Sequence, residues 1–309
     1  MVLPWSRETE KLLEEKLGKE FKRFLPCLWQ NAGNITPYVR YVYMDTITRL
    51  YEKNFAGQIG EWCKEHNVEY IGHIIEDQNV HARLGCGAGH FFRAIRGQHM
   101  AGIDIIGQQV MPRYETFKDV PPGLDLDSEF FHFGLAKMGA SVAHIDPHKK
   151  GRTMCEIFGA SGWACGVKLM KWLVDHALVR GVNWFVPHAF SPKEFPDPDC
   201  PPHFYARGKN PQYRYFGYLM NYANRLCHLL NGGKHVAPVA ILYHAEAEWS
   251  GNYMYFQKPA HWLARNQIDY DIIPADVFEN MEVFNARLES KRFIVNGEEY
   301  LCLVVPYSQ

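Results

Sequence analysis

The segment TMCEIFGASGW, residues 153–163, places one carboxylate, Glu156, in a short β-like run and follows it directly with a glycine-rich turn. Burying a charge in an apolar segment is costly unless a partner compensates it. A turn loosened by Gly159 and Gly162 would leave open space beside the carboxylate. The segment therefore predicts a strand that ends at a pocket, with Glu156 at the mouth of that pocket.

The same order of elements recurs along the chain. Three amphipathic segments, residues 47–67, 166–181 and 213–233, carry apolar side chains at helical spacing. Each is followed by a short apolar run (VEYIGHII, VNWFVPHAF and KHVAPVAILYH), and AGIDIIG and TMCEI stand between them. Near-continuous apolar runs are typical of parallel strands buried on both faces, and their alternation with helices predicts an α/β fold. We expect a (β/α) barrel, with working residues at the carboxyl ends of its strands.

The character of the sequence changes near residue 234. We count about five barrel-type strands before this point, fewer than the eight of a complete barrel. After it, VAPVAILYH, IDYDIIPADVF and EYLCLVVP indicate a second α/β unit with its own short strands. We therefore expect a partial barrel over residues 1–233 and a second domain over residues 234–309. No strand-like run precedes the first helix, and the last residues directly follow a strand-like run, so we expect a fragment that lacks both ends.

Composition restricts the classes of partner. The chain has 309 residues, 47% of them hydrophobic, and a formal net charge of −1. This balance offers no basic patch for nucleic acid, and no apolar run approaches the roughly 18 residues of a membrane span. The N-terminal stretch lacks the apolar core of a signal peptide. The eight cysteines form no CxxC pair, which favours reduced thiols and a cytoplasmic location. We expect no cofactor, no nucleic acid and no membrane partner.

Polar side chains stand at the ends of four predicted strands: His73 with Glu76, then Asp104, Glu156 and His188. In a parallel barrel these ends converge on one rim. Two carboxylates on a common rim are the minimum equipment for glycoside hydrolysis, one as proton donor and the other as nucleophile or as base for water. We therefore expect Glu156 and Glu76 to be catalytic and the other three to bind a carbohydrate substrate.

Aromatic side chains gather near the same strand ends. Trp163, Trp184, Phe190, Phe204 and Tyr205 all follow or lie in predicted strands. Such rings can stack on the apolar faces of sugars, or they can pack the loop that carries them. We expect Trp163 and Phe190 to contact substrate.

Each acidic or histidine candidate also has a structural interpretation. Glu156 could be bonded to a neighbouring strand or an arginine, and Glu76 could be a solvated loop acid. Asp104 could cap the turn that follows it. His73 and His188 could be satisfied histidines of the core or the rim.

No metal site is expected from the histidine motif HIDPH. Its two histidines, at 144 and 148, have the spacing of ligands on a helix. Pro147 stands between them and argues against a continuing helix. A metal-dependent hydrolase that uses His73, Asp104 and His188 is a weaker alternative.

The order of these motifs resembles a known family. WCKEHNVEYIGHIIE, GIDIIG and CEIFGASGW follow one another in the succession found in bacterial α-L-rhamnosidase-like glycoside hydrolases, which are often described as proteins with a family-2-type sugar-binding domain. The resemblance covers nearly the whole chain. It implies a TIM-type barrel that acts on glycosidic bonds, followed by the beginning of a Rossmann-like, glutamine-amidotransferase-like domain. It also implies that Glu156 is one of the catalytic carboxylates.

The resemblance further implies an earlier strand that ends in an acidic motif and precedes the PWS segment. Here the sequence begins at MVLPWS, so we expect the second catalytic acid to lie upstream of Met1, and Glu76 could then bind substrate. The leading hypothesis is a glycoside hydrolase of the α-L-rhamnosidase-like class. The alternative is a catalytically incomplete fragment that at most binds carbohydrate.

Overall fold

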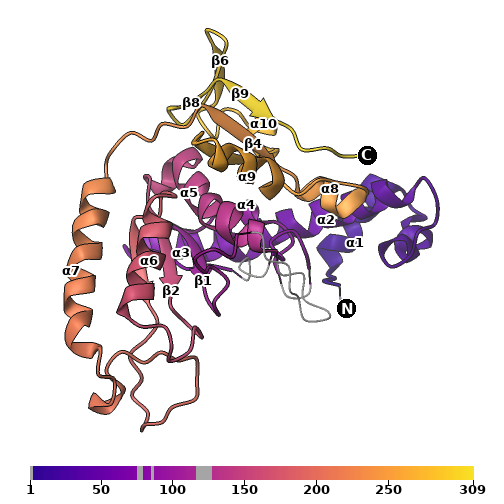
Figure 1. The fold of residues 1–309 in the computed structure, drawn as a ribbon. Helices are drawn as coiled ribbons and strands as arrows, with labels where there is room; N and C mark the ends of the chain where they lie inside the picture. Colours follow the sequence, from indigo (N-terminus) through magenta and orange to yellow (C-terminus); the bar gives the residue numbers. More distant parts are fainter. Residues whose placement is uncertain (1–2, 75–78, 85–86, 116–126) are drawn as a thin grey trace.

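The computed structural model describes residues 3–74, 79–84, 87–115 and 127–309. Helices and short strands alternate along it, which confirms the α/β class (Figure 1). The strands that the structure describes form three separate three-stranded sheets, and none of these closes into a barrel. The strands are β1 (Ala101–Ile105), β2 (Thr153–Ile157), β3 (Trp184–Pro187), β4 (Val239–Tyr243), β5 (Tyr270–Pro274), β6 (Arg287–Glu289), β7 (Arg292–Val295), β8 (Glu298–Tyr300) and β9 (Cys302–Val304).

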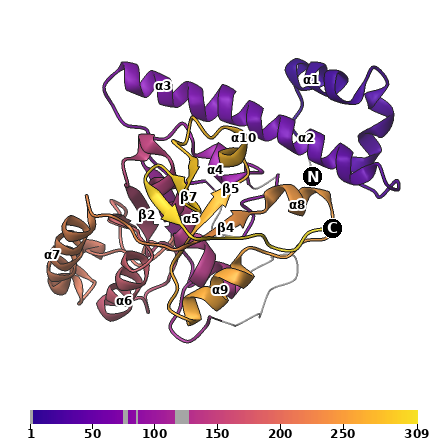
Figure 2. The same cartoon turned by 90° about the horizontal axis from the view of Figure 1, so that it is seen from above.

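Helices surround these sheets. The α-helices are α1 (Arg7–Leu17), α2 (Thr36–Tyr51), α3 (Gln58–Glu65), α4 (Phe91–Ala94), α5 (Ala136–Ile145), α6 (Val167–Leu178), α7 (Tyr213–Leu230), α8 (Ala245–Ser250), α9 (Gln257–Arg265) and α10 (Asp276–Glu279). Of these, α6, α7 and the segment from the end of α2 through α3 were predicted from amphipathic spacing, whereas most of α2 was not. A π-helical segment, Glu52–Gly57, joins α2 to α3, so that the two form one continuous rod across the molecule (Figure 2).

The first sheet has the order β1-β2-β3 and is parallel throughout. All three strands coincide with predicted runs. A fourth run, residues 68–75, was expected to be a strand, but its described part, residues 68–74, forms none. This segment lies beside the residues that lead into β1. The Tyr70 carbonyl oxygen accepts a hydrogen bond there from His99 N at 2.7 Å. The Tyr70 N–H donates to the His99 imidazole at 2.9 Å rather than to a backbone carbonyl, so this pair of residues does not make the backbone-to-backbone exchange of a strand ladder.

The second sheet, β5-β4-β9, is also parallel and lies in the predicted second unit. Beside it β6, β7 and β8 form an antiparallel meander that the sequence reasoning missed. Its second turn is Asn296-Gly297, and both residues have a positive φ. Two-residue hairpin turns require this conformation, so the Asn-Gly pair was an available signal.

Helix α5 packs between the two parallel sheets. Gly139 lets it approach β1 closely, because a Cβ at this position would lie 2.9 Å from the Ile103 side chain. On the other side Ser141 Oγ accepts a hydrogen bond from the Ile272 amide of β5 at 2.8 Å. The core is therefore continuous through α5, from the first sheet to the second.

A network of ion pairs, buried at Arg93, connects helices α2 and α4 to α10. Arg93 of α4 is 1% exposed and donates to both carboxylate oxygens of Asp276, at 2.9 and 2.7 Å. Arg49 of α2 donates to Glu279 of α10 at 2.6 Å. Pairing of this kind is what makes buried charges tolerable.

No helix in the described part of the chain is long and apolar enough to cross a membrane. None of the seven cysteines that the structure describes is paired in a disulfide with another of them, and three, Cys27, Cys155 and Cys165, are buried. Cys302 is exposed, so the expectation of buried thiols holds only for some positions.

Candidate active site

Two carboxylates meet at the carboxyl end of the first sheet. Asp104 of β1 and Glu156 of β2 are direct register partners. Side chains at matched positions of neighbouring parallel strands project from the same face. The residues on either side of them, such as Ile103 and Cys155, are fully buried against the helices. The sheet therefore keeps one face for the core and presents both acids on the other.

His73 lies against both acids. Its Nε2 is 3.6 Å from Glu156 Oε2 and 3.8 Å from Asp104 Oδ2. Its Nδ1 lies 2.7 Å from the Ile74 carbonyl oxygen and donates to it. Because Nε2 then faces two carboxylates, the arrangement suits an imidazolium N–H or a cation shared by the three side chains. The predicted convergence of His73, Asp104 and Glu156 is thus seen in the structure.

Glu156 is the more accessible of the two acids. Its side chain is 30% exposed, against 6% for that of Asp104. Among the described residues no lysine or arginine forms an ion pair with it, so the interpretation as an arginine-bound structural acid receives no support there. It is therefore open to a ligand.

The glycine turn after β2 is held open by its backbone. Phe158 and Ala160 have positive φ values of 83° and 52°. The Gly107 amide, from the turn after β1, donates to Gly159 O at 2.9 Å. The imidazole of His188 lies over Gly159, where a Cβ would come within 3.3 Å of His188 Cγ. His188 is thus on the rim beside the turn, but it does not belong to the group formed by His73 and the two acids.

The long loop between β3 and α7, residues 188–212 and called here the rim loop, supports this turn. Ala160 N donates to Cys200 O at 3.4 Å, and Gly162 N donates to Pro201 O at 2.9 Å. The loop is organised by Asp197, which is 5% exposed and accepts from Ser191 Oγ at 2.5 Å. A hydrogen bond to Asp199, then burial and the charges of Asp199 and Asp104, raise the pKa of the Cys200 thiol. A thiol with a raised pKa is a poor nucleophile at neutral pH.

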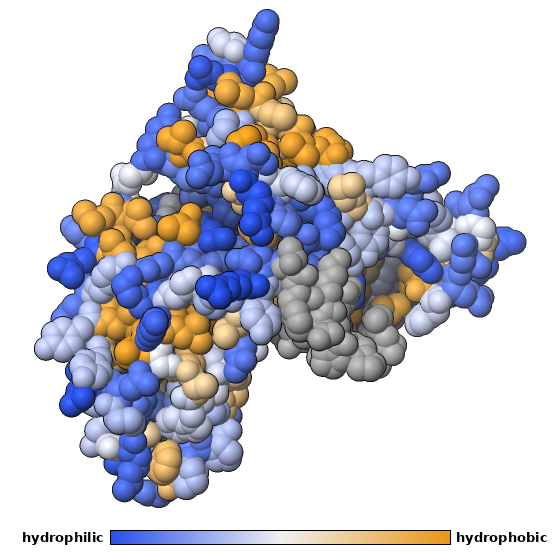
Figure 3. All heavy atoms as spheres, viewed as in Figure 1, coloured by the Kyte–Doolittle hydropathy of each residue, from blue (hydrophilic) through white to orange (hydrophobic). Residues whose placement is uncertain are grey.

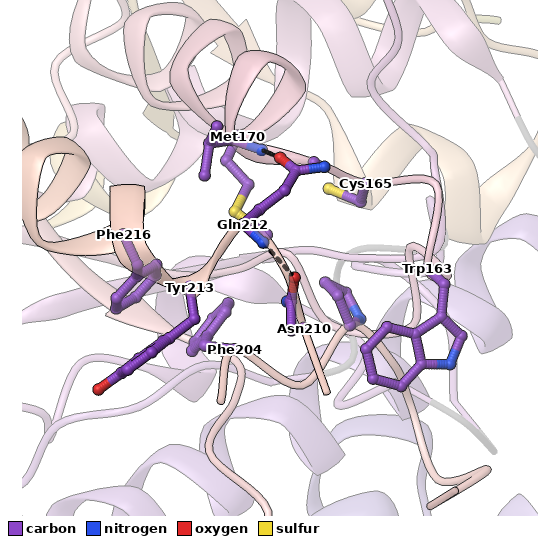
Figure 4. A pocket seen from close by; sticks show the side chains of 11 residues that line it. Trp163, Cys165, Met170, Phe204, Asn210, Gln212, Tyr213 and Phe216 are labelled. Atoms are coloured by element: carbon purple, nitrogen blue, oxygen red, sulfur yellow. Dashed lines mark hydrogen bonds between the residues drawn. The ribbon is translucent and has the colours of Figure 1, made fainter. Parts of the chain in front are cut away.

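The aromatic candidates lie on the same rim. Trp163 is 44% exposed and Phe190 is 58% exposed, so both can be reached from solvent. A narrow pocket of about 20 Å³ lies beside Trp163 and is lined also by Asn210, Gln212 and Tyr213 (Figure 4). Glu76, the predicted partner of Glu156, lies outside the described residues.

A second cluster of histidine and acid was missed by the sequence reasoning. Asp271 of β5 is fully buried, and its Oδ1 accepts from His144 Nδ1 at 2.9 Å and from Ser141 Oγ at 3.1 Å. Its Oδ2 accepts from Tyr300 at 2.9 Å and lies 3.3 Å from His235 Nδ1. These groups come from α5, β5, β8 and the segment before β4, and only HIDPH had drawn attention to His144. Their convergence depends on long-range packing that no local pattern encodes.

Within the part of the chain that the structure describes, two groups have donor atoms close enough together to hold a metal ion: His73 with Asp104 and Glu156, and His144 with His235 and Asp271, in each case within 4.8 Å. They differ in chemistry. Both oxygens of Asp271 already accept hydrogen bonds, and the rings of His144 and His235 stack with centroids 4.0 Å apart. The second group is therefore complete as an ion-pair network, whereas the first, with its partly exposed Glu156, is the better candidate for a ligand.

Comparison with known proteins adds a likeness of fold. No family model matches the chain, and no curated protein matches it in sequence. Among solved structures the chain is similar to a rhamnosidase from Novosphingobium sp. PP1Y, with a TM-score of 0.61 and 17% sequence identity. The match covers 97% of this chain and 27% of that rhamnosidase, so the chain spans about a quarter of its length. At this identity the likeness shows that the two share a fold.

Proposed function

We propose that the chain carries a glycoside hydrolase site of the α-L-rhamnosidase-like class, with Glu156 as a catalytic carboxylate. The observation that carries the proposal is the position of Glu156. It lies at the carboxyl end of a parallel strand, is 30% exposed, and stands 3.6 Å from His73 Nε2 with Asp104 as its register partner. This is the edge of a sheet at which α/β proteins bind their ligands.

Glycosidases need two carboxyl groups, one on each side of the scissile bond. In the proposal Glu156 is one of them, and Glu76 or an acid outside this sequence is the other. The Asp104 carboxylate accepts hydrogen bonds from sugar hydroxyls, and the His73 imidazole donates one. The half-exposed Trp163 stacks on the sugar ring. His188, which lies over the turn at Gly159, contacts the substrate from the adjacent strand end.

The substrate class rests on the fold likeness to the Novosphingobium rhamnosidase and on the family resemblance of the sequence motifs. Both support an L-rhamnoside as the first substrate to try. The same residues would bind the sugar in a chain that lacks the second acid, so binding and turnover are tested separately.

The test compares Glu156→Gln with the parent chain on an aryl α-L-rhamnoside. Glutamine keeps the shape and hydrogen bonding of the side chain but cannot carry charge or transfer a proton, so turnover is expected to fall about 10³-fold or more. Glu282→Gln, which removes an exposed acid far along the chain, is the matched control. Full activity of the Glu156 variant contradicts the proposal. If the parent shows no turnover, binding of L-rhamnose that is weakened by Glu156→Gln supports the binding-only alternative.

A second candidate function follows from the donor set of His73, Asp104 and Glu156. One imidazole and two carboxylates whose donor atoms lie within 4.8 Å fit a divalent cation that would polarise the substrate. This differs from the predicted metal set, in which His188 stood in place of Glu156. Loss of turnover in a chelator and recovery on adding back Ca²⁺ or Mn²⁺ would favour it, whereas full activity in excess chelator counts against it.

A further inference from the structure

A group of exposed aromatic side chains lies beside the proposed site, on the rim loop and on the segments that flank it before α6 and at the start of α7. It consists of Trp163, Phe190, Phe195, Tyr205 and Tyr213, each between 40% and 58% exposed, and is called here the aromatic platform. A contiguous group of exposed aromatic side chains on a folded surface commonly marks a binding site. Over α6, α7 and the loop below them, Figure 3 shows orange apolar residues interspersed with pale and blue ones.

The platform is held in place by ring contacts. Trp163 packs edge-on against Phe195, with ring centroids 5.7 Å apart. Phe190 and Tyr205 each pack against Tyr213, at 6.2 and 5.1 Å. Because the rings support one another, they lose little further freedom when a ligand binds.

The narrow pocket lies between the two sets of rings, Trp163 with Phe195 and Tyr213 with Phe190 and Tyr205. Trp163 and Tyr213 both line it, and Figure 4 shows them on either side of Asn210, with Gln212 nearby. At about 20 Å³ the pocket has room for a water molecule or a hydroxyl group, but not for a ring. The pocket is lined mainly by apolar side chains such as Met170 and Phe204, and the amides of Asn210 and Gln212 are its polar groups. The flanking rings suit the apolar C–H face of a sugar, and the two amides suit a projecting hydroxyl.

The platform is also connected along the chain to the proposed catalytic residue, Glu156. Trp163 follows Glu156 through the glycine turn, and two carbonyl oxygens of the rim loop, those of Cys200 and Pro201, accept hydrogen bonds from amides of that turn. Asp197, accepting from Ser191, fixes the loop from within. The platform therefore starts one short turn after the strand that carries Glu156, at the same end of the sheet.

We propose that the aromatic platform binds the sugar units beyond the scissile bond, so that the substrate is an oligosaccharide or longer glycan rather than a small glycoside. This proposal rests on the proposed function, because it assumes that the terminal sugar occupies the site at Glu156. It adds Phe195, Tyr205 and Tyr213 to the expected contacts, together with the amides of Asn210 and Gln212.

The experiment measures binding by calorimetry in the Glu156→Gln chain, which leaves the ligand intact. The probes are L-rhamnose and a linear pentasaccharide with a terminal L-rhamnose. We expect the pentasaccharide to bind at least tenfold more tightly than the monosaccharide. Adding Tyr213→Ala is expected to weaken pentasaccharide binding about tenfold, the value of one lost ring contact of about 1.4 kcal/mol. Tyr205→Ala serves as a second variant in case Tyr213→Ala lowers the folded population.

Tyr218→Ala is the matched control, because Tyr218 lies on the same helix, α7, but is 76% exposed and outside the platform. Equal affinity for the two probes overturns the proposal, as does an equal effect of the Tyr213 and Tyr218 variants. Binding of the pentasaccharide without turnover of any rhamnoside keeps the platform and contradicts the proposed function. Turnover of an aryl rhamnoside without tighter binding of the pentasaccharide supports the proposed function and contradicts the role of the platform.

Discussion

Glu156 and Asp271 are both carboxylates on parallel strands with a histidine beside them, yet their surroundings are opposite. Asp271 is 0% exposed and is surrounded by donors from three other elements. The Glu156 side chain is 30% exposed, and the ion pair described for it is with His73 alone. A saturated buried carboxylate contributes to the folded state, whereas a partly satisfied carboxylate at a strand end can exchange its partner for a ligand.

The pKa directions follow the same division. Burial alone would raise the pKa of Asp271, but the charges of His144 and Lys137 and bonds to both histidines lower it well below its usual value. Burial lowers the pKa of His235, but the carboxylates of Asp269, Asp271 and Glu298 outweigh this effect and raise it to about 11. The Asp271 cluster is thus an ionic connection between α5, β5 and β8, and a hollow of about 750 Å³ lies beside His144 and His235.

The largest expected effect is on stability at the buried acid. Asp271→Asn removes the charge that compensates Lys137 and the two histidines, and breaking a buried pair in this way costs about 3–5 kcal/mol. Urea unfolding monitored by circular dichroism gives the free energy of unfolding. A loss below about 1 kcal/mol would mean that the cluster is not a structural element.

The next effect is the pH dependence that His235 gives to stability. Its pKa is raised in the folded state, so the folded state binds more protons than the unfolded state above about pH 6.5. The resulting stabilisation is complete below pH 6.5 and is lost progressively as the pH rises toward about 11. His235→Gln is expected to remove about 2 kcal/mol at pH 6, the value of hydrogen bonds to a charged group.

The measurement compares the free energy of unfolding of the parent chain and His235→Gln at several pH values between 6 and 10. Subtracting one curve from the other cancels the groups that the two proteins share. The difference should shrink steadily as the pH rises. A constant difference would show that His235 is neutral in the folded protein.

The sequence predicted the first of these regions better than the second. Strand β2 and the turn after it form a local pattern, and parallel register then brings Asp104 beside Glu156. The surroundings of Asp271 depend instead on α5 reaching β5 and on His235 in the connection before β4. In DYDIIP nothing marks Asp271 as paired, because its partners are up to 130 residues away.

Strand prediction succeeded for most of the apolar runs, including the partly exposed β3, and failed for short polar strands. β1, β4 and β5 are almost entirely buried and read as apolar runs. The short strands β6 and β8 carry the sequences RLE and EEY, which resemble loop residues. They pair because two tight turns bring them together, so their stability comes from the turns and from Tyr300, which is 1% exposed.

A smaller effect on stability is expected at the rim. Glu156→Gln should change the free energy of unfolding by less than about 1 kcal/mol, because a partly exposed acid contributes little to folding. The free energy of unfolding of this variant is measured by the same urea unfolding as that of Asp271→Asn, so that the losses at the exposed and the buried acid can be compared directly. A loss as large as that of the Asp271 variant would place Glu156 among the structural acids and remove the basis for its proposed role.

The smallest effect tests how tightly His188 is held over the glycine turn. In Gly159→Ala the new methyl group would lie 3.3 Å from His188 Cγ, so the imidazole must shift by a few tenths of an ångström. We expect a loss of stability of about 0.5 kcal/mol or less and a several-fold rise in KM for an aryl rhamnoside, with kcat nearly unchanged, because the ring contacts substrate without taking part in proton transfer. Gly151→Ala is the control, because no atom lies within 4 Å of its Cβ position and its φ of 69° makes the substitution strain the backbone away from His188. If the Gly151 variant raises KM as much as the Gly159 variant does, the effect comes from the backbone in general and His188 is not a contact of the site.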